Sequence, residues 1–256
     1  MNSVMPFQLS ESQVAEFKRD GYVVAPRMFD PLTVARIAGW TDEVVRAPET
    51  PGRHMVYYED DRRRPSQRIV SRIENFCPFF PSFNEFLNTR PALDCLAQLF
   101  GEPAVMFKDK INFKLPGGDG FKAHQDVQAG WDTYGSLHIT MLISIDASTR
   151  ENGCLEIAAG AHRDGLLGER WQPLADPDPR IIYQPCPTQP GDAIFFDSYV
   201  PHRSQANETS EQRRILYMTY GKAADGDHRV AYYADKRKNY PPDCERDPAK
   251  VYSFKV

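Results

Sequence analysis

The fold class follows from one segment, Ala104-Val105-Met106-Phe107-Lys108-Asp109-Lys110-Ile111-Asn112-Phe113-Lys114. From this segment onward the chain consists of short stretches rich in Val, Ile, Phe and Tyr, which are separated by Gly, Pro, Asn and Asp. This alternation of short strands and turns is typical of an all-β sandwich or barrel. Because helices are expected upstream, the sequence predicts a mainly β protein, a jelly roll supported by N-terminal helices. Its further strands are predicted at 137–146, 154–158, 181–187, 193–196 and 213–221.

The region before residue 104 is predicted to be mostly helical. Ser10 caps a helix that ends at Gly21, and a short strand follows at 22–25. Asp30-Pro31 begins a second helix through about residue 46, and more helix is predicted between 82 and 100, with a new start at Pro91. In contrast, residues 48–68 are polar and show no sustained period, which predicts a flexible surface loop.

The 256 residues are expected to form one domain, since sandwiches and barrels of roughly 200 to 250 residues are routinely a single unit. Residues 1–103 would support a jelly-roll core at 104–222. Two interpretations of the C-terminal segment 223–256 stay open. It is either a lid over the active site or a solvated segment packed by its tyrosines.

Composition excludes several classes of protein and partner. Hydrophobic residues make up 41% and charged residues 26% of the chain, which is typical of globular proteins and excludes disordered and membrane-spanning ones. The net charge of -4, without a run of one sign, argues against nucleic acid or a membrane as partner. Five cysteines without a Cys-x-x-Cys pair fit reduced thiols, and no signal peptide is recognisable, so a cytoplasmic location is predicted.

Two short motifs supply candidate metal ligands. In His124-Gln125-Asp126, an extended backbone would place His124 and Asp126 on one face and Gln125 on the other. His202 follows the apolar strand at 193–196, which would hold it in a fixed position. Taken singly, each motif is equally explained by solvated loop residues. Together they match the two-histidine, one-carboxylate set that binds Fe(II) and leaves positions open for a cosubstrate and O2, although zinc accepts the same ligands.

Arg213 begins a strand eleven residues after His202, and one face of that strand would carry Arg213, Ile215, Tyr217 and Thr219. A guanidinium inside an apolar barrel is unfavourable unless it meets an anion, and its planar fork suits a carboxylate. A dicarboxylate cosubstrate would supply that anion. The alternative is that Arg213 and Arg214 are both exposed and the even-numbered face is buried.

In combination these motifs resemble the phytanoyl-CoA dioxygenase family of Fe(II)/2-oxoglutarate oxygenases. The resemblance runs from Phe17-Lys18-Arg19-Asp20-Gly21-Tyr22 through Glu151-Asn152-Gly153-Cys154-Leu155 to Arg213. It implies a double-stranded β-helix core of cupin type and a hydroxylase that releases succinate and CO2. Intact Asp126 favours hydroxylation over halogenation. The resemblance further implies that His124, Asp126 and His202 bind iron, that Arg213 and Ser204 bind the distal carboxylate of 2-oxoglutarate, and that Arg72, Lys110, Asn112 and Leu142 surround this cosubstrate.

The strand at 107–114 carries a clue to the substrate. Strict alternation places Lys108, Lys110, Asn112 and Lys114 on one face, as a cationic wall if it points inward or as a solvated face if it points outward. An inward wall would suit a small phosphonate, phosphate or carboxylate. The segments 72–76 and 128–131 resemble bacterial aminoalkylphosphonate hydroxylases, so Lys108, Asn75, Gln125 and Trp131 are the candidate substrate contacts.

Two other functions remain compatible with the motifs. One is a jelly-roll binding module without turnover, and the other is a cupin-type metal isomerase or hydrolase. Neither needs a dicarboxylate clamp, so Arg213 and Ser204 beside the triad favour the oxygenase. His138, which begins a predicted strand, has no partner motif and is predicted to be a core or surface histidine.

Overall fold

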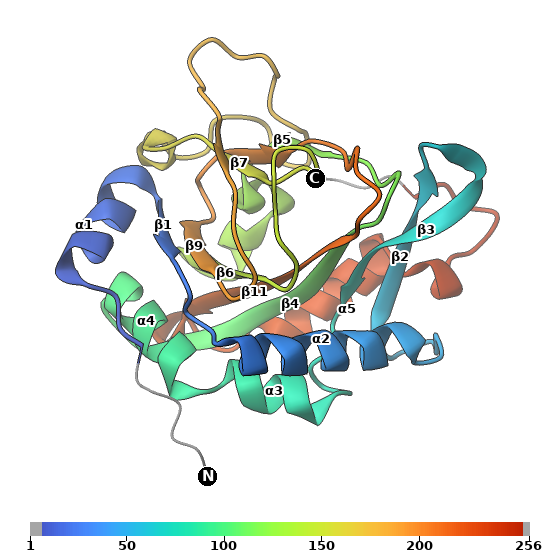
Figure 1. The fold of residues 1–256 in the computed structure, drawn as a ribbon, viewed down its shortest axis with the longest axis horizontal. Helices are drawn as coiled ribbons and strands as arrows, with labels where there is room; N and C mark the ends of the chain where they lie inside the picture. The colour runs from blue at the N-terminus through green and yellow to red at the C-terminus, as the bar shows by residue number, and fades with distance from the viewer. Residues whose placement is uncertain (1–6, 253–256) are drawn as a thin grey trace.

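The computed structural model describes residues 7–252, which form two facing antiparallel sheets (Figure 1). The larger sheet has the order β1-β9-β6-β11-β4-β3-β2, and the smaller one has the order β5-β10-β7-β8. The predicted mainly β jelly roll, a double-stranded β-helix, is confirmed. The strands of the larger sheet are β1 (Tyr22–Ala25), β2 (Met55–Asp61), β3 (Arg64–Glu74), β4 (Ala104–Lys114), β6 (His138–Ser144), β9 (Ala193–Asp197) and β11 (Arg213–Lys222). Those of the smaller sheet are β5 (Phe121–His124), β7 (Leu155–Ile157), β8 (Gln184–Cys186) and β10 (His202–Ser204).

Four N-terminal helices support the outer face of the larger sheet. They are α1 (Glu11–Asp20), α2 (Pro31–Arg46), α3 (Pro81–Leu87) and α4 (Arg90–Phe100), and in Figure 1 α2 and α3 lie beneath the sheet. Their apolar side chains share one core with outward-facing residues of β6, β9 and β11. Ser10 caps α1 in a reciprocal capping box with Gln13, and Asp30 caps α2 ahead of Pro31, as the sequence predicts.

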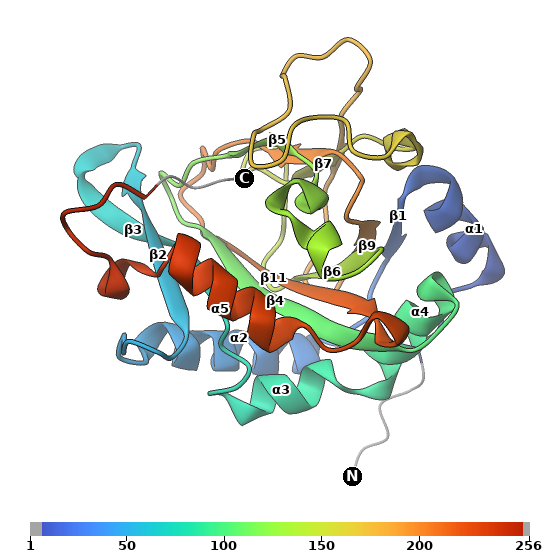
Figure 2. The ribbon, with the colours of Figure 1, turned by 180° about the vertical axis from the view of Figure 1, so that it is seen from behind.

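The fifth helix, α5 (Arg229–Asn239), packs beside β4 on the side seen in Figure 2. Tyr232 and Tyr233 bury their rings there, together with Phe107 and Trp131. Five short 3-10 helices complete the described structure: Asp126–Ala129, Trp131–Thr133, Ala161–Asp164, Ala223–Asp225 and Asp243–Glu245. Among the described residues no helix is both long and apolar enough to cross a membrane.

The prediction of a flexible loop at 48–68 is wrong for most of this segment. Residues 55–74 form the antiparallel hairpin of β2 and β3. Two register shifts interrupt its alternation, and the outer half of β3, Arg64 to Arg68, is exposed on both faces. A strand that is bulged and solvated lacks the period of two by which strands are recognised, so the pattern was invisible in the sequence. The region before residue 104 therefore contributes three strands as well as helices.

The lysine-bearing face of β4 points into the space between the sheets. Ile111 and Phe113, on the opposite face, join the core beneath the helices. Asp109 also lies on that opposite face, where the Phe76 and Cys77 amides and Arg229 donate hydrogen bonds to its carboxylate. The sequence left open whether this face points inward or outward, and in the structure it points inward.

A β-bulge then changes the alternation at one end of β4. Thr219 pairs with Lys108, whereas the next residue, Tyr220, pairs with Met106. Phe107 is the extra residue, and it turns toward Trp131 on the same side as Lys108.

Candidate active site

Three potential metal ligands meet at the edge of the smaller sheet. His124 ends β5 and pairs directly across the ladder with His202, the first residue of β10, so their ring centroids lie 4.2 Å apart. Asp126 follows at the start of a 3-10 helix. One ligand atom from each residue lies within 4.8 Å of the other two, so the structure brings together the three side chains predicted from the sequence.

Backbone carbonyls orient both imidazoles toward this point. The Nδ1 atom of His124 lies 2.7 Å from the Lys122 carbonyl, and the Nδ1 atom of His202 lies 3.0 Å from that of Val200. If each Nδ1 donates its proton to the carbonyl, each Nε2 presents its lone pair to a metal, which is the usual arrangement of metal-binding histidines.

Electrostatics keeps the three groups in the protonation states that bind metal. Burial, aided by His202, lowers the pKa of His124 to about 3, and burial also lowers the pKa of His202. Burial alone would raise the pKa of Asp126, but His202 and Lys110 outweigh it, and the pKa is lowered. At neutral pH the site therefore offers two neutral imidazoles and a carboxylate. This donor set fits Fe(II) in an oxygenase.

A small cavity adjoins the ligands. Thr140 and Thr219 share a hydrogen bond of 2.9 Å in its wall, and the Thr140 hydroxyl donates to Asp126 at 3.5 Å. Thr140 and Phe196 were not predicted as site residues, although Thr140 lies two positions before Leu142 on one strand and so shares its face. The lining residues are Lys108, Lys110, Asp126, Trp131, Thr140, Phe196, His202, Tyr217 and Thr219.

Arg213 and Arg214 show which face of β11 is buried between the sheets. Arg213 points between the sheets and is 1% exposed, and neither its Nε nor its Nη1 has a hydrogen-bond partner among the described residues. Arg214 points outward and forms a two-pronged ion pair with Asp146. Burial lowers the pKa of Arg213, yet a guanidinium stays charged in proteins. A buried cation with unpartnered donors is the feature expected of a carboxylate site.

Ser204, a predicted cosubstrate residue, is linked to Arg213 through Lys114. Lys114 lies opposite Arg213 on β4, and the Lys114 amine donates to the Ser204 hydroxyl at 2.8 Å and to the Gln205 carbonyl. Gly153, in the Glu151 to Leu155 motif, has a φ of 75°, and a Cβ there would collide with that same carbonyl. Burial, reinforced by Arg213, lowers the pKa of Lys114 to about 6, which makes it a neutral amine near pH 7.

The remaining cosubstrate candidates lie one and two rows further along the barrel. Asn112 pairs with Ile215, and its buried Oδ1 has no hydrogen-bond partner within residues 7–252. Lys110, Tyr217 and Leu142 form the next row across three strands. Arg72 is paired with Asn112 across β3 and β4, but its guanidinium contacts Glu74 at 3.0 Å.

Of the four predicted substrate contacts, the structure places two at the cavity. Lys108 and Trp131 line it, with the amine 5.1 Å from the centre of the indole ring. Gln125 instead points away, and its amide bonds the backbone of Gly165, Leu167 and Tyr199. Asn75 occupies a left-handed turn after β3 and is not among the lining residues. Gln125 and Asn75 thus lie outside the lining of this cavity, and their predicted contact with the substrate stays a prediction.

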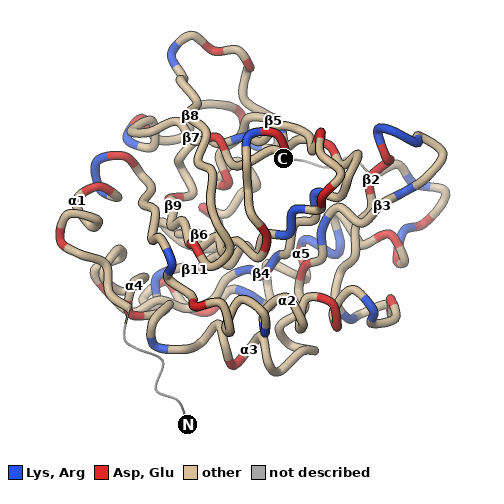
Figure 3. Tube along the Cα trace, in the orientation of Figure 1, with Lys and Arg blue, Asp and Glu red and all other residues tan. Residues whose placement is uncertain are grey.

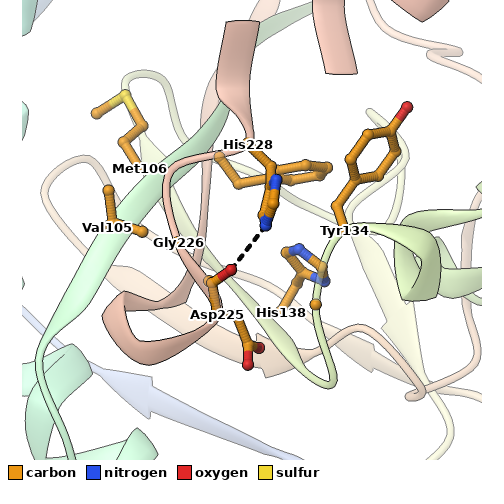
Figure 4. A pocket seen from close by; sticks show the side chains of 10 residues that line it. Val105, Met106, Tyr134, His138, Asp225, Gly226 and His228 are labelled. Carbon is orange, nitrogen blue, oxygen red and sulfur yellow. Dashed lines mark hydrogen bonds between the residues drawn. The ribbon is translucent and has the colours of Figure 1, made fainter. Parts of the chain in front are cut away.

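His138 is a buried core histidine, as the sequence favoured. Its ring packs against Phe107, and burial lowers its pKa to about 4. Figure 4 shows it in a second small cavity beside Tyr134 and His228, where the Nε2 atom of His228 lies 2.7 Å from the carbonyl oxygen of Asp225.

Fold and site together define a class, the double-stranded β-helix oxygenases that use iron and 2-oxoglutarate. The sequence matches the family described as "Phytanoyl-CoA dioxygenase (PhyH)" over residues 17–215, and the chain belongs to this family. It is 37% identical over 249 residues to a 2-aminoethylphosphonate dioxygenase from an uncultured bacterium, covering 95% of this chain and 94% of the relative. It is 38% identical over 234 residues to a methylphosphonate hydroxylase from Gimesia maris, with coverage of 91% and 88%.

Solved structures agree on the fold. EctD from S. alaskensis, solved with 2-oxoglutarate and 5-hydroxyectoine, superposes with a TM-score of 0.70 at 20% identity, over 88% of this chain and 79% of that one. The non-heme alpha ketoglutarate dependent carbocyclase SnoK gives 0.68 at 22% identity, over 84% and 85%. Family membership makes the chain a dioxygenase, which disfavours the binding module and the isomerase or hydrolase considered from the sequence.

Proposed function

We propose that this protein hydroxylates a small organophosphonate, with Fe(II), 2-oxoglutarate and O2, and releases succinate and CO2. The observation that carries the proposal is the cavity beside His124, Asp126 and His202, into which Lys108 and Lys110 project from β4. A small anion is the substrate that such a wall attracts. Two relatives above 35% identity, named for aminoethylphosphonate and methylphosphonate, support the phosphonate among small anions.

Each end of the site has a separate task in this proposal. His124, Asp126 and His202 would hold the iron. Arg213 would bind the distal carboxylate of 2-oxoglutarate through the donors that have no protein partner, and the Ser204 hydroxyl would add a hydrogen bond. The groups that would flank the rest of the cosubstrate are Lys110, Asn112, Leu142 and Tyr217.

Bound iron with 2-oxoglutarate would supply the oxidising chemistry that inserts one oxygen atom of O2 into a C–H bond. The chain's own residues would hold that bond in place and exclude water. Thr140 would fix the Asp126 carboxylate through its hydroxyl. Phe196 and Trp131 would provide an apolar wall for the alkyl part of the substrate.

The test is succinate formation by the purified protein with Fe(II) and 2-oxoglutarate. Methylphosphonate and 2-aminoethylphosphonate are compared with acetate and β-alanine, their carboxylate counterparts. We expect succinate release to depend on a phosphonate and to disappear in Asp126→Ala. Release that is independent of phosphonates, or that persists in Asp126→Ala, contradicts the proposal. The matched control is Asp60→Ala, an exposed carboxylate on the β2–β3 hairpin.

We also propose a cytoplasmic location. All five cysteines are free in the structure, which suits a reducing compartment. Separation of cytoplasmic from exported protein in the producing cell tests this, and recovery in the exported fraction contradicts it.

A further inference from the structure

A buried carboxylate, Glu74, gathers three cations at the end of the cavity away from Arg213. Its Oε1 lies 3.0 Å from the Nε of Arg72, and its Oε2 lies 2.5 Å from the Nζ of Lys236 and 3.8 Å from the Nζ of Lys108. We call these four residues the Glu74 cluster. They come from β3, β4 and α5, and Figure 3 shows the basic residues of β4 and α5 close to one another.

The Glu74 cluster is almost closed to solvent. Glu74 is 1% exposed, and the side chains of Arg72, Lys108 and Lys236 are between 8% and 11% exposed. Arg72 and Lys108 face this one carboxylate as cations, which already leaves a surplus of one positive charge, and a protonated Lys236 would add a second. Burial of surplus charge is unfavourable, and burial does lower the pKa of Lys236 well below its ordinary value, although Glu74 raises that of Lys108.

Aromatic faces compensate only part of this surplus. The Arg72 guanidinium lies 4.5 Å from the centre of the Tyr57 ring, and the Lys108 amine lies 5.1 Å from that of Trp131. A cation–π contact is worth roughly 0.5–2 kcal/mol, less than a buried counter-ion provides. The cluster is therefore expected to attract a further anion.

Lys108 connects the cluster to the cavity. It lines the cavity with Asp126, and its contact with Glu74 is the longest of the three and exceeds a hydrogen bond. An anion beside Lys108 would thus bring its charge to the Glu74 cluster while its organic part lies against Trp131, toward the metal ligands.

We propose that the Glu74 cluster is the subsite for the phosphonate group of the substrate. Lys108 contacts the oxyanion directly, and Lys236 and Arg72 are positioning residues that strengthen the field behind it. This inference rests on the proposed function. A phosphonate carries between one and two negative charges near neutral pH and three acceptor oxygens, as a phosphate monoester does, and so matches the surplus better than a carboxylate.

Lys236 gives the C-terminal helix a part in specificity. Tyr232 and Tyr233 anchor α5 against β4, and this anchoring brings Lys236 to Glu74 from 162 residues away in the chain. Arg72, expected from the family resemblance to lie at the cosubstrate, belongs in this proposal to the opposite end of the site.

The experiment compares Lys108→Gln, Lys236→Gln and Lys236→Arg with the wild type. Lys238→Gln is the matched control, because Lys238 lies on α5 and is exposed. Anaerobic calorimetry of the protein loaded with Fe(II) and 2-oxoglutarate measures the Kd for methylphosphonate, and steady-state kinetics gives the KM for each substrate. Thermal melting checks that each variant is folded.

We expect Lys108→Gln to raise the Kd for methylphosphonate by about 10- to 100-fold, the effect of one charge-assisted hydrogen bond. The KM for 2-oxoglutarate should stay within about twofold, since Arg213 lies at the other end of the site. Lys236→Gln should weaken phosphonate binding less, Lys236→Arg should restore most of it, and Lys238→Gln should change nothing.

The outcomes separate the two proposals. If the wild type binds and oxidises a phosphonate but the lysine variants bind it equally well, the subsite is overturned and the proposed function stands. The proposed subsite is also overturned if the variants lose affinity for the phosphonate and for 2-oxoglutarate to the same extent. If the folded wild type binds no phosphonate, both proposals fail.

Discussion

Two positions of β4 carry buried basic side chains in opposite conditions. At the end of the strand Lys114 lies opposite Arg213, whose Nε and Nη1 lack partners within the described residues. Near the middle of the strand Lys108 lies close to Glu74, which also binds Arg72 and Lys236. Both positions are buried to a similar degree, so the difference lies in the internal carboxylate and not in exposure to solvent.

The difference shows two ways to build an anion site. Where the described residues offer no partner, as at the Nε and Nη1 of Arg213, the ligand supplies the opposite charge and contributes to folding stability by mass action. Where the protein supplies a carboxylate, as at Glu74, the ligand balances only the remaining positive charge. We therefore expect removal of Glu74 to harm the fold and removal of Arg213 to harm ligand binding.

The largest effect is expected for Glu74→Gln. The substitution keeps the shape of the side chain but leaves Arg72, Lys108 and Lys236 without the carboxylate that they share. Loss of one partner of a buried ion pair typically costs about 3–5 kcal/mol. We expect urea unfolding to show a loss of this size. The control Glu208→Gln removes an exposed carboxylate that pairs with Arg62 and should leave stability nearly unchanged. Equal losses in both variants would contradict the role given to Glu74.

The contrast between these two positions of β4 also shows what the sequence could predict. The alternation at 104–114 predicted the strand with its bounds and the face that Lys108 shares with Lys110 and Lys114, but it left open whether this face points inward. The spacing of His124, Asp126, His202 and Arg213 predicted residues that the fold does bring to one barrel. Each of these signals lies within a few residues of a strand end or follows the period of that strand.

The Glu74 cluster had no such signal. Lys236 reaches Glu74 only because α5 packs on β4, and a contact across 162 residues leaves no local pattern. The hairpin that carries Glu74 was hidden by its bulges and its exposed outer half. Strands β5 and β10, with four and three residues, are too short to show a period, although they carry the metal ligands.

The second largest effect is expected for Arg213→Met, which should weaken ligand binding without lowering stability. The loss of charge-assisted hydrogen bonds should weaken 2-oxoglutarate binding by about 100-fold, or roughly 3 kcal/mol. The unfolding free energy without 2-oxoglutarate should stay equal or rise, because an uncompensated buried charge is replaced by an apolar chain. Anaerobic titration with 2-oxoglutarate and urea unfolding measure the two quantities. A less stable variant with unchanged affinity would reverse our assignment.

A third, pH-dependent effect separates Lys114 from Lys108. Burial and Arg213 lower the pKa of Lys114 to about 6, against about 10.5 in an unfolded chain. Between these values the unfolded state binds a proton that the folded state lacks, so stability should rise with pH, by up to about 1.4 kcal/mol per unit. Glu74 raises the pKa of Lys108, so that group adds no slope in this window.

Urea unfolding at pH 6.5, 7.5 and 8.5, without 2-oxoglutarate, measures this slope. We expect Lys114→Met to flatten the rise relative to the wild type and Lys108→Met to leave it unchanged. If both variants keep the wild-type rise of unfolding free energy with pH, a group other than Lys114 is responsible for that rise.

The smallest effect is expected for Arg214→Met, the neighbour of Arg213 on the outer face of β11. Arg214 forms two hydrogen bonds of 2.9 Å with Asp146 and one of 2.9 Å with Asp42, so its charge is already balanced by the protein. A partly exposed pair of this kind stabilises a fold by about 1 kcal/mol. We expect a loss of that size and no change in 2-oxoglutarate affinity. Arg213 and Arg214 are neighbours on opposite faces of one strand. Weaker 2-oxoglutarate binding in Arg214→Met would therefore show that disturbance of the strand, and not loss of the unpartnered guanidinium, accounts for the effect of Arg213→Met.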